Sequence, residues 1–197
     1  MKTLIYIAAL AASAAAIPSA AIAQRAPDAV VVVVDSDRIY RECTACKSAQ
    51  GQLQAKVTAL QTRQKSLADG LRPEGQAIQA AIRALSGKDP DAALRTRVQA
   101  FQAKEEAANK ELTAGQQNLQ SIQANVVRQI NARMSPVINQ VMTARGANIA
   151  VDVGATLAHS QSVNVTAAVL AGLNAALPSV SLTPLPASQQ QQQPPGR

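Results

Sequence analysis

Two cysteines separated by two residues, Cys43 and Cys46, form the only motif in this sequence that looks chemically reactive. Positions i and i+3 lie on one face of a helix, and Cys-x-x-Cys thiols can have lowered pKa values. In an oxidising compartment, however, the default state of such a pair is a disulfide. A redox enzyme would also need a thioredoxin-like βαβ context, which this sequence does not offer. We therefore expect a local disulfide first, a link between subunits second and redox catalysis third.

Other signatures of an enzyme are missing from the sequence. Zinc needs about four ligands, whereas the chain has two cysteines and one histidine, His159; only ligands shared between subunits would complete such a site. The adjacent acids Glu105 and Glu106 have no second catalytic partner, and there is no serine-histidine-acid set or phosphate-binding glycine loop. We therefore predict a protein that is not an enzyme and that carries no cofactor and no metal.

The apolar residues on either side of Asp89-Pro90 form a mirror-image pattern. Before this dipeptide they follow steps of four and three residues: Leu53, Val57, Leu60, Leu67, Leu71, Ile78, Ala81 and Leu85. After it the steps run in reverse: Leu94, Val98, Phe101, Ala108, Leu112, Leu119, Ile122 and Val126. The two helices of an antiparallel coiled-coil hairpin should show this pattern. At about 1.5 Å per residue, each helix would extend roughly 50 Å.

Residues 86–90 form the expected tip of this hairpin. Gly87 has no Cβ and therefore suits the left-handed position just past a helix end. Asp89 is suited to cap the next helix, with Pro90 in its first position. On the outgoing helix, Pro73 has a glycine close to it on each side and predicts a bend. The apolar seam is interrupted at two weak layers: Gln64 with Gly115, and Glu74 with Glu105.

Residues 1–23 have the features of a secretory signal peptide. A basic start, Lys2, precedes an apolar stretch, Leu4–Ile17, and small residues mark a cleavage site at Ala21–Ala23. The apolar stretch is shorter than the roughly 20 residues that span a bilayer. The formal net charge is +7, which favours anionic membranes, acidic polymers or negatively charged clients as partners. Nucleic acid is excluded by the compartment and by the absence of a binding motif.

Segments that favour strands lie at both ends of the mature chain. Ala29–Val34 is a run of mostly β-branched residues, and Ile149–Val153 is a second short strand, followed by a closing amphipathic helix at Thr166–Leu177. The two ends must meet in one small body, whose unpaired sheet edges favour oligomerisation. The sequence thus predicts a mainly helical α+β fold in which a long helical hairpin is inserted into a small β-rich body. Its expected parts are a signal peptide, a two-part body, an arm and a disordered Pro- and Gln-rich tail: residues 1–23, 24–46 with 134–178, 47–133, and 179–197.

These features resemble the Skp/OmpH family of periplasmic chaperones of Gram-negative bacteria. The resemblance lies in Val30–Asp35 followed by Arg38–Tyr40, and in Ile149–Val153 followed by Val163–Leu177. It implies a periplasmic homotrimer in which a β-rich body holds the subunits together and helical arms enclose an unfolded outer-membrane protein without ATP. Contact with lipopolysaccharide or anionic phospholipid is a further implication. The cysteine pair, the Gln-rich tail and the many alanines of the arms depart from the family.

The leading hypothesis is an ATP-independent holdase for unfolded outer-membrane proteins in transit. Basic arms would attract acidic clients, and moderate apolar surface would hold them loosely. The candidate client contacts are the basic residues of the arm: Lys56, Arg63, Lys65, Arg72, Arg83, Lys88, Arg95, Arg97, Lys104 and Lys110. One alternative is a coiled-coil structural or adaptor protein of the cell envelope, which would bind a folded partner or the cell wall. The third is a thiol-disulfide oxidoreductase that uses Cys43 and Cys46.

Overall fold

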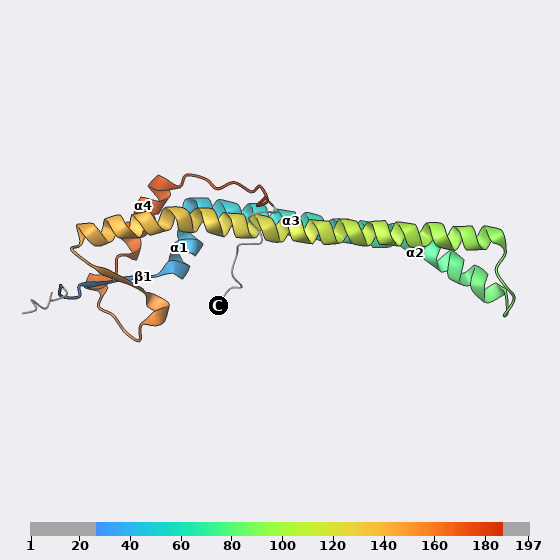
Figure 1. Cartoon of the computed structure of the whole chain (residues 1–197), viewed down its shortest axis with the longest axis horizontal. Helices are drawn as coiled ribbons and strands as arrows, with labels where there is room; N and C mark the ends of the chain where they lie inside the picture. Colours follow the sequence, from blue (N-terminus) through green and yellow to red (C-terminus); the bar gives the residue numbers. More distant parts are fainter. Residues whose placement is uncertain (1–26, 187–197) are drawn as a thin grey trace, which may run out of the picture.

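The structure, a computed structural model, describes residues 27–186 and shows a small body with one long helical arm (Figure 1). The predicted signal peptide, residues 1–23, lies outside the described residues, as do residues 187–197 of the predicted tail. The mainly helical fold with a long hairpin and a small sheet is confirmed. Its elements are, in chain order, β1 (Val31–Val34), α1 (Ser36–Glu42), α2 (Thr44–Ala84), α3 (Ala92–Ala144), β2 (Ile149–Asp152), η1 (Val153–Ala155), η2 (Gln161–Val163) and α4 (Thr166–Ala176).

β1 and β2 form a two-stranded parallel sheet that joins the two ends of the chain. Val31 lies opposite Ile149, and Val34 lies opposite Asp152. On its other side, β1 makes one isolated bridge, to Asn164. The outer edge of β2 therefore has no strand partner within residues 27–186, and most of the body around this sheet is helical.

The hydrophobic core lies in the body and in the base of the arm. Ile39 of α1 is fully buried there, and the same core continues along α2 to Ala49 and along α3 from Ile122. It therefore extends past the expected boundaries of the body, residues 46 and 134. Farther out along the arm, Ile78 and Ala108 are the only buried apolar residues among those described.

Beyond the core, glycines bring the two helices of the arm close together. A Cβ on Gly115 would lie 2.7 Å from Cδ1 of Leu60, and a Cβ on Gly75 would lie 3.0 Å from the ring of Phe101. The layer of Gln64 and Gly115, expected to be weak, is thus a place where a leucine of one helix contacts the backbone of the other. A pattern of apolar residues could not show this contact, because glycine contributes no side chain to it.

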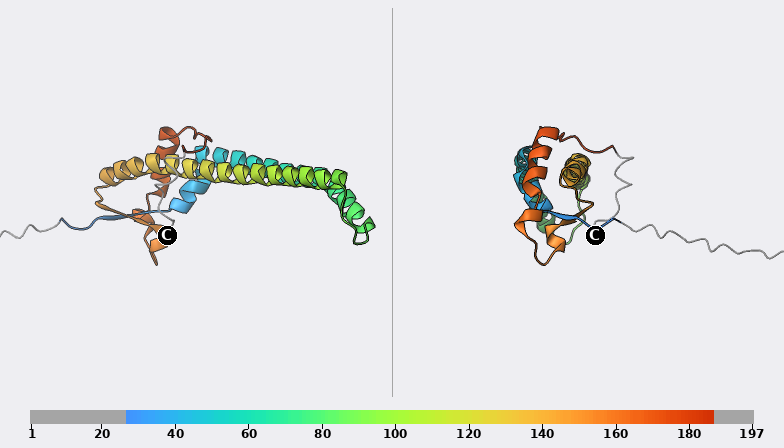
Figure 2. Two further views of the ribbon diagram at one scale, coloured as in Figure 1. Left: turned by 45° about the vertical axis from the view of Figure 1, so that its right-hand side comes forward. Right: turned by 90° about the vertical axis from the view of Figure 1, so that its left-hand side faces the viewer.

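The outer end of the arm combines a bend with a tight turn. α2 runs through Pro73 without a break, and Figures 1 and 2 show its outer part turning away from the line of its inner part. The chain then reverses at Ser86 and Gly87, whose φ angles are 48° and 91°. Asp91, not Asp89, caps α3, because its carboxylate accepts a 2.7 Å hydrogen bond from the first turn of the helix.

The prediction of a disordered tail from residue 179 is wrong for residues 179–186. This segment follows α4 and runs in an extended conformation beside the base of the arm (Figure 1). Leu185 is only 5% exposed, and its backbone N–H donates a 2.7 Å hydrogen bond to the hydroxyl of Ser121. The Pro- and Gln-rich composition indicates disorder, but it does not show the residues of α3, far away in the sequence, that hold this segment in place.

A pair of glycine variants will test how tightly α4 is held. A Cβ on Gly172 of α4 would lie 2.8 Å from Cγ1 of the buried Val137, whereas a Cβ on Gly51 of α2 would meet nothing within 4 Å. Alanine gains about 1 kcal/mol of helix propensity at either position, but at Gly172 overpacking costs about 1–3 kcal/mol. In urea unfolding, Gly172→Ala should therefore be less stable than Gly51→Ala by about that cost. Equal stabilities would contradict a tight contact between α3 and α4.

Candidate functional site

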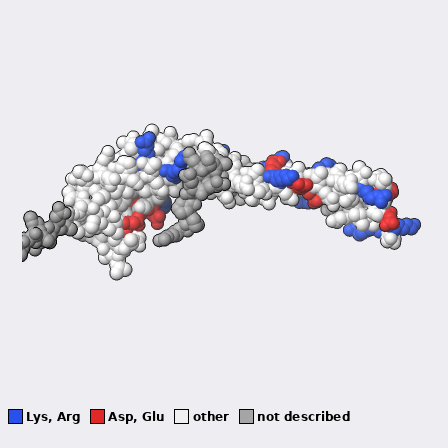
Figure 3. All heavy atoms as spheres, in the orientation of Figure 1, with Lys and Arg blue, Asp and Glu red and all other residues white. Residues whose placement is uncertain are grey.

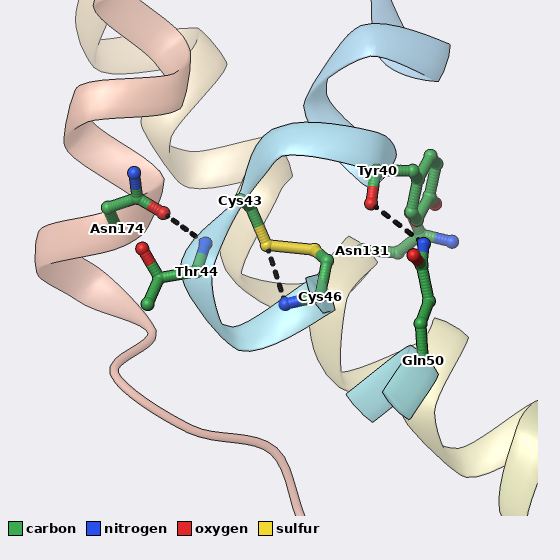
Figure 4. Close-up of a disulfide and its surroundings, with 7 residues drawn as sticks. All are labelled: Tyr40, Cys43, Thr44, Cys46, Gln50, Asn131 and Asn174. Atoms are coloured by element: carbon green, nitrogen blue, oxygen red, sulfur yellow. Dashed lines mark hydrogen bonds between the residues drawn. A yellow bond between two sulfur atoms is a disulfide. The ribbon is translucent and has the colours of Figure 1, made fainter. Parts of the chain in front are cut away.

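The two cysteines form a disulfide at the junction of α1 and α2 (Figure 4). Cys43 does not lie within a helix, because its backbone is extended (φ −63°, ψ 139°) and it separates the two helices. Its Sγ also accepts a 3.0 Å hydrogen bond from the backbone N–H of Cys46. Both residues are buried, at 1% and 2% exposure. The first of the three expectations, a local disulfide, is the arrangement in the structure.

The surroundings of the disulfide join the helices of the body to one another. The backbone N–H of Thr44 donates a 2.8 Å hydrogen bond to the side chain of Asn174 in α4. The side-chain amide of Gln50 donates to the backbone carbonyl of Tyr40 at 3.2 Å, and the Tyr40 hydroxyl bonds to Asn131 of α3. Burial raises the pKa of Tyr40, and the hydrogen bond to Asn131 opposes this shift. These contacts indicate a structural role for the junction, since the sulfurs are closed off from solvent.

The remaining candidates for chemistry lie apart from one another. His159 is within 3.2 Å of the side-chain amide of Asn164, and Glu106 forms an ion pair with Lys110 one helical turn away. Within residues 27–186, no group of three or more His, Cys, Asp and Glu side chains is placed to hold a metal ion. In the same part of the chain, no helix is long and apolar enough to cross a membrane.

Most of the basic residues expected to contact a client form ion pairs. Three of these pairs join the arm helices. In the two shorter ones, Arg63 donates to Glu111 at 2.6 Å, and Lys104 donates to Glu74 at 2.6 Å. Glu74 therefore bridges the helices at a layer expected to be weak. Arg97 lies 3.9 Å from Glu74 as well. The other basic residues in ion pairs have partners within their own helix: Lys65, Arg72 and Lys110.

Four of the ten candidate client contacts form no ion pair in the described structure: Lys56, Arg83, Lys88 and Arg95. Lys56 lies near the base of the arm, whereas the others flank or occupy the turn between α2 and α3. Figure 3 shows blue side chains extending from this end of the molecule. All four are exposed. Asp89 and Asp91 lie in the same turn, so the tip carries three cations and two carboxylates and is only weakly positive.

Comparison with known proteins relates this arrangement to one family. A family described as "Outer membrane protein (OmpH-like)" has a sequence profile that matches residues 30–173. Among solved structures, a proposed OmpH-like outer membrane chaperone from Caulobacter crescentus CB15 superposes with a TM-score of 0.68 at 18% sequence identity. The match covers 84% of this chain and 96% of that one. No protein with a curated description matches the sequence.

Removing the disulfide will distinguish a structural role of the cysteine pair from a redox role. Cys43→Ser with Cys46→Ser should lower the stability of the body, because the chain-entropy model assigns about 2 kcal/mol to so short a loop. In the native protein, buried sulfurs should resist exchange with glutathione until the body unfolds. Urea unfolding and the rate of thiol labelling will measure both effects. Rapid reduction of the folded protein, or reductase activity lost in the double variant, would restore the redox hypothesis.

The ion pair between the arm helices should make the arm sensitive to acid. The hydrogen bond from Arg63, and then its charge, hold the pKa of Glu111 below its ordinary value of 4.5. A carboxylate with a lowered folded-state pKa stabilises the fold above its unfolded pKa, and this contribution is lost as the pH falls through the folded value. Glu111→Gln should therefore lower the melting temperature slightly at about pH 7, and the difference from the wild type should shrink as the pH falls through and below the ordinary value of 4.5.

The matched control for this experiment is Glu106→Gln, which removes the same charge from an ion pair within α3. Its effect at neutral pH should be the smaller of the two, because it does not join two helices. A Glu111→Gln effect that persists unchanged in acid would show that the carboxylate charge is not what stabilises the arm.

Proposed function

Because the chain belongs to the OmpH-like family, it has a chaperone role, and we propose that it is an ATP-independent holdase for unfolded outer-membrane proteins in the periplasm. The observation that carries the proposal is the arm. Beyond the core at its base, most side chains of α2 and α3 are exposed, and only a narrow seam between the helices is partly buried. A two-helix ribbon of this kind contributes surface rather than an enclosed site, which suits a large client without fixed structure.

Charged and apolar surfaces lie at different places along the arm and would contact different parts of a client. The unpaired cations at the tip attract acidic clients over a distance that salt screening limits to about 10 Å. The same tip is where lipopolysaccharide or anionic phospholipid would contact the arm. Nearer the body, an apolar hollow between the helices is lined by Leu53, Val126 and Val127, and Val127 is 45% exposed. Apolar side chains of a client would bind loosely there.

A homotrimer gives this arm the partners it needs to enclose a client. Val30, Val31 and Ile149 are 45%, 39% and 42% exposed. Val31 and Ile149 are paired across the sheet, so the three residues lie close together on the body. Burying such a surface between subunits stabilises an oligomer by about 25 cal/mol per Å². Subunits joined through the body would project their arms around a common cavity.

Native mass spectrometry of the mature protein, with and without a urea-unfolded outer-membrane barrel, tests this function. The expected result is a trimer that captures one soluble unfolded chain and ignores the same barrel once folded. A protein that leaves the barrel to aggregate, or that binds folded envelope proteins instead, would favour the structural adaptor.

Removing the cations of the tip should weaken client capture. The triple variant Arg83→Gln, Lys88→Gln and Arg95→Gln removes the unpaired cations there, and we expect affinity for the unfolded barrel to fall by roughly threefold to tenfold at low salt. Light scattering during dilution of the barrel from urea will measure the loss. The effect should shrink as salt rises, because screening already weakens the attraction.

A second triple variant provides the matched control. Lys65→Gln, Arg72→Gln and Lys110→Gln removes the same charge from residues in ion pairs within one helix. It should retain most of the capture. Equal losses in the two variants would mean that net charge, rather than the tip, governs binding.

A further inference from the structure

Residues 179–186, here called the strap, follow the base of the arm in the direction opposite to α3. Its residues contact α3 in reversed order: Ser181 meets Gln129, Thr183 meets Asn125, and Leu185 meets Ser121. Figure 2 shows in end view the same segment passing over α3 after α4. The family profile ends at residue 173, so the strap lies outside the part of the chain matched to the family.

Side chains of α3 hold the strap through its backbone. The amide of Gln129 accepts a 2.9 Å hydrogen bond from the N–H of Ser181 and donates one of 2.9 Å to its carbonyl. The amide of Asn125 donates to the carbonyl of Thr183 at 2.9 Å. The hydroxyl of Ser121 accepts from the N–H of Leu185 at 2.7 Å and donates to its carbonyl at 3.4 Å.

The spacing of these contacts makes the row of side chains equivalent to the edge of a neighbouring β-strand. Ser121, Asn125 and Gln129 recur every four residues, which is about 6 Å along a helix. Alternate residues of an extended chain lie about 6.6 Å apart and present their N–H and C=O groups at the same edge. Pro184, which has no N–H, occupies an intervening position, where none is needed.

The apolar side chains of the strap suggest that the site prefers alternating apolar and polar residues rather than one particular sequence. Leu185 is buried, and Val180 and Leu182 pack against the core at the base of the arm. From Val180 to Thr183 the strap alternates apolar and polar residues. This period of two is the pattern of strands in outer-membrane barrels, where one face meets lipid and the other the lumen.

We infer that the row formed by Ser121, Asn125 and Gln129 is a binding site for one extended segment of an unfolded outer-membrane barrel, and that the strap occupies it as a built-in competitor. The inference rests on the proposed function and adds where, and by which atoms, a client strand is held. Because the hydrogen bonds are made to the backbone, the site accepts any extended segment in which apolar and polar residues alternate. Such a site suits clients of many different sequences.

The strap weakens the apparent affinity of the row for any other extended segment, because that segment must displace the strap. Because it is tethered to α4 only a few residues away, it competes at an effective concentration in the millimolar range. A single short peptide therefore binds poorly to the complete chain. An unfolded barrel offers many alternating segments in one molecule and can displace the strap where a lone peptide does not.

A fluorescent peptide with the sequence of residues 179–186 is the first probe. The mature chain truncated after Pro178 should bind it at least tenfold more tightly than the complete chain does. Should truncation impair folding, Leu185→Asp in the complete chain loosens the strap and leaves the row intact, with the exposed position of Ser179→Asp as its control. Unchanged affinity in both the truncated chain and Leu185→Asp would overturn the inference.

Backbone recognition is tested by N-methylation of the peptide. Methylation at Ser181 removes an N–H bonded to Gln129 and should weaken binding roughly threefold to tenfold, whereas methylation at Leu182 should have little effect. In the truncated chain, Gln129→Ala should abolish binding and the exposed control Gln123→Ala should not. Equal effects of the two methylations would overturn recognition through the backbone.

Competition with a urea-unfolded barrel decides whether the site serves clients. Displacement of the peptide by a barrel that stays soluble is the expected result. A barrel held soluble without displacing the peptide would overturn the inference and leave the proposed function intact. A barrel that aggregates would overturn the proposed function; a peptide of alternating Val and Thr then serves as the competitor, and its failure to displace the probe would overturn the site as well.

Discussion

The pairing of β1 with β2 is the constraint on which the rest of the structure depends. Each strand has four residues, and a two-stranded sheet of this length is marginal by itself. Side chains at both ends secure it: Asp152 accepts from the backbone of Ser36 at 3.2 Å, and Asn148 accepts from the backbone of Val30 at 2.9 Å. Because the strands are parallel and adjacent, the bases of α2 and α3 must also lie side by side. This closure brings the two helices of the arm together at their base.

An arm anchored at its base has little need of a core along its length. Once the core ends, the helices are held by glycine contacts such as Leu60 on Gly115 and by exposed ion pairs such as Arg63 with Glu111. Exposed ion pairs contribute about 0–1 kcal/mol each, so no single layer dominates the stability of the arm.

The sequence predicts those features that a periodic pattern or one special residue determines by itself. The hairpin follows from apolar spacing, the tip from Gly87, and the strands from β-branched runs at the two ends. Contacts that depend on the partner could not be predicted. Gly115 contributes no apolar side chain, yet Leu60 packs on its backbone. Glu74 interrupts the seam by its type, yet Lys104 and Arg97 reach it from the other helix.

The contacts of the strap are another feature that the sequence pattern could not predict. They also explain why the polar row on α3 is tolerated at the edge of the core. Ser121 and Asn125 are 7% and 6% exposed, and polar groups buried without partners would each cost about 1–3 kcal/mol. Their partners are backbone groups of the strap, and the described structure contains no buried side-chain nitrogen or oxygen without a hydrogen bond. The row is therefore complete only when an extended chain lies on it. A surface that needs an extended chain but contacts only its backbone is what the proposed competition between the tail of this chain and an unfolded barrel requires.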